Sequence, residues 1–234
     1  MERDKLDHLT AIPDARVPGT ALNAFIAAFG VFFSMYTRPW KARDPRSRAH
    51  IGVGAFNLIR AEVYRAIGTH RAIAMRPDDD LKLGKLVKKH GFRQDVVYAR
   101  AFIVVEWYSS LGEMIDGLMK NSFAGVDYSM VKVVGSTAAM FLTNVWPFIA
   151  LVATHGVTQA LNGLSALLIV LIFWTSARYG GYGGTRLLYV IAFPAAALLF
   201  IYIIWRSALL AVIRGTVMWR GTAYPLAQMR ANKV

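Results

Sequence analysis

Three long apolar stretches, each without Lys, Arg, Asp or Glu, occupy the second part of this chain: residues 133–153, 158–177 and 187–205. Each approaches or reaches the ~20 residues with which a helix crosses a ~30 Å hydrocarbon layer. Hydrophobic residues make up 56% of the chain and charged residues only 18%, against about 25% in an ordinary soluble domain. This composition excludes a disordered chain and predicts a membrane protein.

The charges divide the 234 residues into two regions. All 14 acidic residues lie between Glu2 and Asp127, so residues 1–132 hold 20 basic groups beside them, and the remainder holds 7 basic groups and no acid. The net charge of +13 suits anionic lipid or a phosphorylated substrate. The basic residues are dispersed along a largely apolar chain, which argues against nucleic-acid binding. The absence of cysteine excludes disulfides, thiolate catalysis and cysteine-ligated metals.

The positions of polar and charged residues leave open how many of the three stretches cross the membrane. Thr143, Asn144 and Pro147 interrupt the first stretch, so it is either broken or re-entrant. If all three crossed, the basic tail after Trp205 would lie opposite the polar first half, against the positive-inside rule. The run 21–36 is short for a span and is interpreted as an interfacial or buried helix. The Gly-rich segment 178–186 is interpreted as a short connection between two spans rather than as a phosphate-binding loop.

The polar half alternates strand and helix patterns. Residues 1–12 suggest the end of a helix followed by a strand; residues 55–59 predict a strand, and a helix follows that ends at Gly68. A second helix runs from the acidic triplet to Gly91, strands are predicted at 96–98 and 102–105, and an amphipathic helix begins at Ser109. The alternation predicts an α/β unit.

The triplet Asp78-Asp79-Asp80 has two interpretations. Carboxylates at a helix start cap the helix and interact with its dipole. Alternatively, crowded carboxylates raise the pKa of one member and make it a general base. The residues alone favour capping, and we assign Asp78 to that role.

The order of motifs resembles the membrane-bound family 2 glycosyltransferases, in particular ceramide glucosyltransferases and hopanoid-associated glycosyltransferases. The resemblance rests on residues 44–68 (DPRS…GAFNLIRAEVYRAIG), on the acidic pair in DDLKLGKLVKKHG, on EWYSSLGEMIDGLMKNSFA and on WRGTAYPLAQMR. It implies that Asp80 is the catalytic base, that Asp79 orients the base or contacts the acceptor, and that Trp107, Arg220 and Tyr224 bind substrate. Trp107 is equally well explained as an aromatic anchor, and Arg220 and Tyr224 as interface anchors.

Two departures from the family pattern affect this interpretation. Of the Gln-x-x-Arg-Trp motif only Trp107 is present, in IVVEW. No Asp-x-Asp with preceding strands stands before Ile12, so the nucleotide-binding half is expected to be absent, through truncation or division between two proteins. We therefore expect a divalent metal (Mg or Mn) only in the complete enzyme, none bound by this chain, and no sugar transfer by the chain alone.

These arguments together predict an incomplete GT-A-like α/β catalytic domain followed by a helical transmembrane region. The expected division is a catalytic portion with interfacial helices over 1–132, transmembrane helices over 133–205 and a basic interfacial tail over 206–234. The expected activity is inverting transfer from a nucleotide sugar to a lipid or membrane-associated acceptor, in a bacterial inner membrane with the polar half in the cytoplasm. The competing interpretation is a non-catalytic basic membrane protein that binds anionic lipid.

Overall fold

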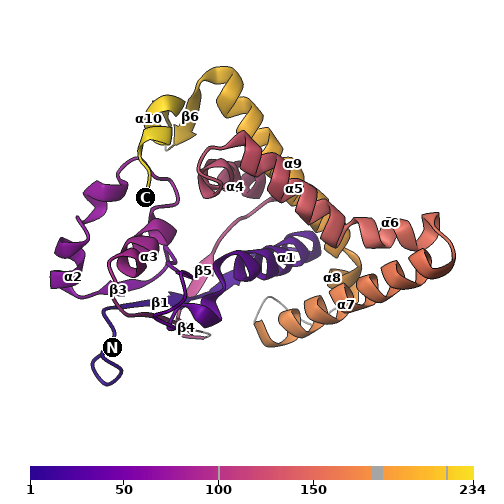
Figure 1. Cartoon of the computed structure of the whole chain (residues 1–234), viewed down its shortest axis with the longest axis horizontal. Coiled ribbons are helices and arrows are strands. Elements are labelled where there is room, and N and C mark those ends of the chain that lie inside the picture. Colours follow the sequence, from indigo (N-terminus) through magenta and orange to yellow (C-terminus); the bar gives the residue numbers. More distant parts are fainter. Residues whose placement is uncertain (100, 181–186, 220) are drawn as a thin grey trace. The chain divides into compact units, whose positions relative to one another are not determined.

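The computed structural model describes residues 1–99, 101–180, 187–219 and 221–234, and Figure 1 labels many of their helices and strands. They form two compact units. Unit 1 comprises Met1–Asp14, Phe33–Val105 and Gly215–Val234, and unit 2 comprises Ala15–Phe32 and Glu106–Arg214. The boundaries predicted at residues 132 and 205 are based on charge and hydropathy, whereas the two units are defined by contacts between residues. The two divisions describe different properties and do not coincide.

Unit 1 is built on a small mixed sheet with the strand order β3-β1-β4. The central strand β1 (His8–Ile12) runs antiparallel to β3 (Asn57–Ile59) and parallel to β4 (Gln94–Tyr98). Side chains alternate between the two faces of a strand, and the alternate residues His8 and Thr10 are fully buried. A separate two-stranded sheet joins β2 (Asp14–Arg16) to β5 (Val104–Glu106). The predicted strands are therefore present.

Three helices of unit 1 pack through one apolar cluster. They are α2 (Ala61–Ala66), the short 3-10 helix η2 (His70–Ile73) and α3 (Asp79–Lys89). Their buried apolar side chains are those of Val63, Ile67, Ile73, Leu83, Leu86 and Val87. The two predicted helix ends are confirmed, because Gly68 and Gly91 follow α2 and α3 with φ of 87° and 79°, a conformation that glycine adopts without strain.

The predicted helix end before β1 is wrong. Residues 2–5 form a turn, in which the amide of Lys5 bonds to the carbonyl of Glu2 and the amide of Leu6 to that of Met1. A single turn gains too few hydrogen bonds to persist as a helix.

The C-terminal tail is part of unit 1. It consists of the hairpin of β6 (Thr216–Trp219) and β7 (Thr222–Pro225), followed by α10 (Leu226–Ala231). Asn232 donates to the carbonyl of Ala72 at 3.3 Å, and Lys85 Nζ donates to Val234 O at 2.6 Å. The tail therefore packs on η2 and α3.

Unit 2 is helical. Ser110 caps α4 (Leu111–Gly125) by accepting from the amide of Glu113 at 3.2 Å. The helices that follow are α5 (Met130–Asn144), α6 (Trp146–Ala153), α7 (Gly156–Gly180), α8 (Leu187–Ile191) and α9 (Phe193–Arg214). The predicted break in the first stretch is confirmed, since α5 and α6 meet at a bend of 48°. The third stretch differs from one continuous helix: Pro194 lies in the first turn of α9, where its missing N–H is tolerated, and α8 ends before it.

Among the described residues, three helices are long and apolar enough to cross a membrane. They are Thr20–Lys41, which contains α1 (Thr20–Thr37), Gly156–Thr175 in α7, and Phe193–Arg214, and the bent pair α5–α6 would make a fourth. Only 11% of the α7 window is buried within the protein. Exposed apolar surface of that extent is stable in lipid and costly in water, so the prediction of a membrane protein is supported.

Candidate active site

The candidate site lies where the loop of residues 51–56 meets the first turn of α3. Two glycines allow this approach, because a Cβ on Gly52 would lie 1.8 Å from the carbonyl oxygen of Asp80 and one on Gly84 would lie 2.1 Å from that of Ile51. Contacts below 3.0 Å with backbone atoms are not found for real Cβ atoms. The sequence GVG at 52–54 therefore fixes the loop directly against the helix that carries the acidic triplet.

Asp80 is held by the backbone on both of its carboxylate oxygens. Oδ1 accepts from the amide of Leu81 at 2.7 Å, and Oδ2 accepts from the amide of Gly54 at 2.8 Å. Partial burial raises the pKa of Asp80 above its ordinary value, the two amides oppose that shift, and the negative charges of Asp79 and Asp78 reinforce it. The arrangement is a fixed carboxylate with an increased affinity for a proton.

Asp79 lies beside this carboxylate. Its Oδ1 accepts from the backbone amide of Asp80 at 2.9 Å, and its side chain is half-buried. This contact places the Asp79 charge next to Asp80, which agrees with the predicted orienting role without testing it.

The assignment of Asp78 to helix capping is wrong. Asp78 occupies the N-cap position, but its side chain makes no capping hydrogen bond. Its carboxylate instead binds the Arg76 guanidinium through two bonds of 2.9 and 3.0 Å and lies 3.5 Å from Lys82 Nζ. Arg76, Asp78 and Lys82 are all buried, and a buried carboxylate is stable only with such partners. Asp78 is therefore a structural ion-pair member.

Two buried side chains that the sequence analysis missed hold the loop of residues 51–56. Gln94 accepts from the amide of Ile51 at 2.8 Å and donates to the carbonyl of Gly84 at 2.7 Å. Thr10 accepts from the amide of Val53 at 3.0 Å and donates to the carbonyl of Phe56 at 2.7 Å. Because both are fully buried, these bonds are protected from water. A polar residue at the start of a strand gives no sequence signal for this role.

The other predicted site residues are distributed between the units. Tyr224 lies on β7 in unit 1, with its ring 5.7 Å from that of Trp219. Trp107 belongs to unit 2, where it is half-buried against Phe29 and Tyr108 at ring distances of 5.5 and 5.0 Å. This packing is that of an aromatic anchor. Arg220 and most of the Gly-rich segment 178–186 lie outside the described residues.

Two histidines of unit 1, His70 and His90, form hydrogen bonds within the protein. His70 shares a 2.6 Å hydrogen bond with the Tyr64 hydroxyl, and His90 bonds to the carbonyl of Leu86 at the end of α3. Within the described parts of the chain, no group of three His, Asp or Glu side chains is placed to hold a metal ion. The described residues therefore offer no site with three protein ligands for the divalent metal that the resemblance implies.

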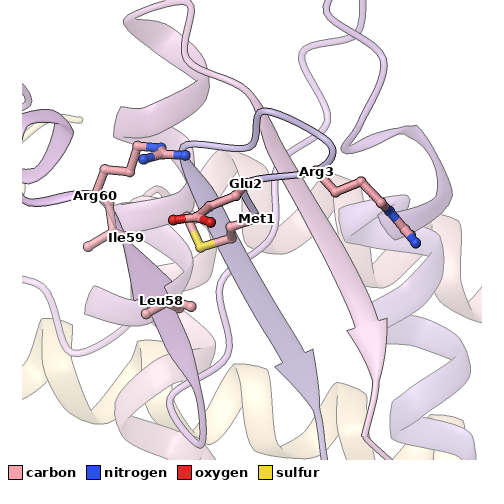
Figure 2. A pocket seen from close by; sticks show the side chains of 6 residues that line it. All are labelled: Met1, Glu2, Arg3, Leu58, Ile59 and Arg60. Atoms are coloured by element: carbon pink, nitrogen blue, oxygen red, sulfur yellow. The ribbon is translucent and has the colours of Figure 1, made fainter.

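A shallow pocket lies beside β3, away from the predicted site residues. Figure 2 shows its lining side chains: Met1, Glu2, Arg3, Leu58, Ile59 and Arg60. Arg60 also donates to the carbonyl of Leu6 at 3.1 Å, so it ties the first residues to the sheet. None of the predicted site residues lines this pocket.

The described chain combines small sheets and helices around the fixed carboxylate with several apolar helices. The family model described as glycosyl transferase family 21 matches residues 4–231. The chain therefore belongs to glycosyl transferase family 21, a ceramide glucosyltransferase-like family. The comparison with curated proteins and that with solved structures each gave no match. Membership supports a glycosyltransferase and does not favour the non-catalytic alternative.

Proposed function

We propose that the protein takes part in inverting transfer of a sugar from a nucleotide-sugar donor to a hydroxyl of a lipid or membrane-associated acceptor, with Asp80 as the general base. The observation that carries this proposal is the Asp80 carboxylate, fixed by the amides of Leu81 and Gly54 in a chain of this family. The resemblance to ceramide glucosyltransferases and hopanoid-associated enzymes supports a lipid acceptor and a GT-A-like domain.

The geometry supports proton transfer to Asp80. Each carboxylate oxygen has two lone pairs, and one lone pair of each oxygen accepts a hydrogen bond from a backbone amide. The remaining lone pairs are available to the acceptor hydroxyl. As its proton moves to Asp80, its oxygen bonds to the anomeric carbon and the nucleoside diphosphate leaves with the electron pair of the broken bond. A raised pKa improves the match between base and hydroxyl.

Asp79 is proposed as a positioning residue for this base, because it accepts from the Asp80 amide. Acceptor contacts by Trp107, Arg220 and Tyr224 remain proposals from the resemblance. The nucleotide-binding half and its divalent metal likewise remain predictions.

The polar half is proposed to face the cytoplasm, where nucleotide sugars are available, in a bacterial inner membrane. The basic residues of the tail support that side.

The test is an Asp80→Asn allele in the cells that encode the protein, which keeps every natural partner present. Lipid extracts examined by mass spectrometry are expected to lose a hexosylated lipid and to accumulate its unglycosylated precursor. Asp4→Asn, a change at an exposed ion pair, is the control and should leave the lipids unchanged. Immunoblots must show equal amounts of both proteins. Unchanged glycolipids in the Asp80→Asn cells would contradict the proposal.

A further inference from the structure

The end of α1 combines exposed apolar side chains with basic ones. Met35, Tyr36 and Trp40 are 60%, 59% and 65% exposed, and Arg38 and Lys41 between and beside them are exposed as well. These five residues, here called the α1–η1 patch, run from the last turns of α1 into η1 (Pro39–Lys41). All of them belong to unit 1.

The backbone turns these residues outward as a set. Thr37, Pro39 and Ala42 are buried and alternate with the exposed residues of the patch. Arg38 has left-handed backbone angles (φ 50°, ψ 58°), its amide bonds to the carbonyl of Ser34 and its carbonyl accepts from the amide of Lys41, both at 2.8 Å. The chain is therefore held with one side on the protein and the patch on the other.

Although α1 is apolar enough to span a membrane, the connections of unit 1 prevent it from crossing. β1 ends at Ile12, seven residues before α1 begins, and an extended segment of that length reaches only ~23 Å. After α1, Lys88 Nζ holds the carbonyls of Ala42 and Asp44 at 2.6 and 2.7 Å. Neither connection can recross ~30 Å of hydrocarbon. Both ends of α1 therefore lie on the side of unit 1.

Most of α1 before the patch is buried within the protein, so the exposed end of the helix is the part that fits the membrane interface. Aromatic and basic side chains at the end of such a helix match the headgroup layer, where ring and cation each find a suitable environment. No Asp or Glu occurs between Asp14 and Asp44, so acidic repulsion from anionic lipid is absent along the helix. A protein partner would require no comparable excess of positive charge.

We propose that the α1–η1 patch is a membrane-docking surface of unit 1, with Trp40, Tyr36 and Met35 inserted at the headgroup level and Arg38 and Lys41 bound to anionic lipid phosphates. The proposal is independent of the chemistry assigned to Asp80. It places unit 1 against the leaflet from which a lipid acceptor would come.

The absence of cysteine allows a direct test with single spin labels on the whole chain in lipid nanodiscs. A nitroxide at Trp40→Cys should collide more with oxygen than with a water-soluble nickel complex. The same label at Glu62→Cys, on the exposed face of α2, is the control and should show the reverse. Equal water accessibility at both positions would overturn the proposal, and protection of the Trp40→Cys label from both reagents would indicate a protein contact instead.

The charge contribution is tested by lipid composition. The label at Trp40→Cys should lie deeper in nanodiscs that contain phosphatidylglycerol than in phosphatidylcholine alone. Arg38→Gln combined with Lys41→Gln should abolish that difference. If the double variant does not fold, the label at Trp40→Cys is measured with Arg38 and Lys41 unchanged and with added salt. Salt screens the two charges, so the difference in label depth between the two lipids should disappear. A label depth that is the same in both lipids would refute binding to anionic headgroups.

Discussion

Asp80 and Asp78 are two residues apart in the same acidic triplet but have opposite environments. Asp78 forms ion pairs with Arg76 and Lys82, whereas Asp80, among the described residues, meets backbone amides and the charge of its acidic neighbours. The raised pKa of Asp80 favours acceptance of a proton by its carboxylate, and the carboxylate of Asp78 is occupied by its two cations. The side-chain partners therefore decide which carboxylate is available for chemistry.

The first prediction concerns the pH dependence of transfer. The base acts when deprotonated, so activity should fall as the pH drops through the raised pKa of Asp80. Asp79→Asn removes a negative charge that raises this pKa and keeps the oxygen that accepts from the Asp80 amide. The acid limb of kcat/KM should consequently move to lower pH. A limb that stays in place or moves to higher pH would contradict the assignment of Asp80 as the base.

The second prediction is that Asp78→Asn destabilises the fold. Removing the carboxylate charge takes an ion-pair partner from the buried Arg76 and Lys82, and breaking a buried pair costs about 3–5 kcal/mol. Asp4→Asn, which affects two ion pairs at the surface, with Arg3 and with Arg43, should cost about 0–1 kcal/mol. Thermal unfolding of both variants in detergent measures the difference. Equal transition temperatures would mean that the triplet residue is not a structural ion-pair member.

At the scale of elements, the contact of loop and helix determines where Asp80 points. The third prediction is that Gly52→Ala separates the loop of residues 51–56 from α3, because the new methyl would meet the Asp80 carbonyl at 1.8 Å. Overpacking against fixed atoms costs typically about 1–3 kcal/mol. The Gly54–Asp80 hydrogen bond should break, and transfer should fall more than stability does.

Gly112→Ala is the matched control for this change. Its Cβ would meet nothing within 4 Å, and the residue lies in the first turn of α4. It should be neutral or slightly stabilising, since alanine favours helix more than glycine does. Equal loss of transfer in the two variants would show that the Gly52 contact does not position the base.

Local chemistry predicts those features of the elements that depend on one or two neighbouring residues. The helix ends at Gly68 and Gly91 and the break near Pro147 were predictable, because each follows from the backbone preferences of one or two residues. The bonds from Gln94 and Thr10 to the loop were not, because they join residues 43 positions apart. The pairing of Asp78 with Arg76 depended on burial, which the local pattern does not reveal. Asp79 and Asp80 could be predicted as site residues from the sequence only through the family resemblance.

At the scale of the whole molecule, the position of the tail restricts the membrane topology. Val105 and Gly215 both belong to unit 1, and Asn232 and Lys85 tie the tail to that unit. The chain between them must therefore cross the membrane an even number of times. The pair α5–α6, α7 and α9 offer up to three crossings by length, so at least one of them does not cross.

The fourth prediction assigns that role to α5–α6. Its 48° bend follows Asn144, and a polar amide beside a break is tolerated where the segment turns back or lies against protein. With α7 and α9 as the two crossings, single cysteines at Glu62, His155 and Lys233 should all resist an impermeant thiol reagent on intact cells, and Gly181→Cys should react. After permeabilisation, Glu62→Cys, His155→Cys and Lys233→Cys should react too, which confirms that protection reflects sidedness.

Reaction of His155→Cys with protection of Gly181→Cys would mean that α8–α9, and not α5–α6, is the segment that does not cross. Reaction of Lys233→Cys in cells where Glu62→Cys is protected would require an odd number of crossings and would contradict the packing of the tail on unit 1.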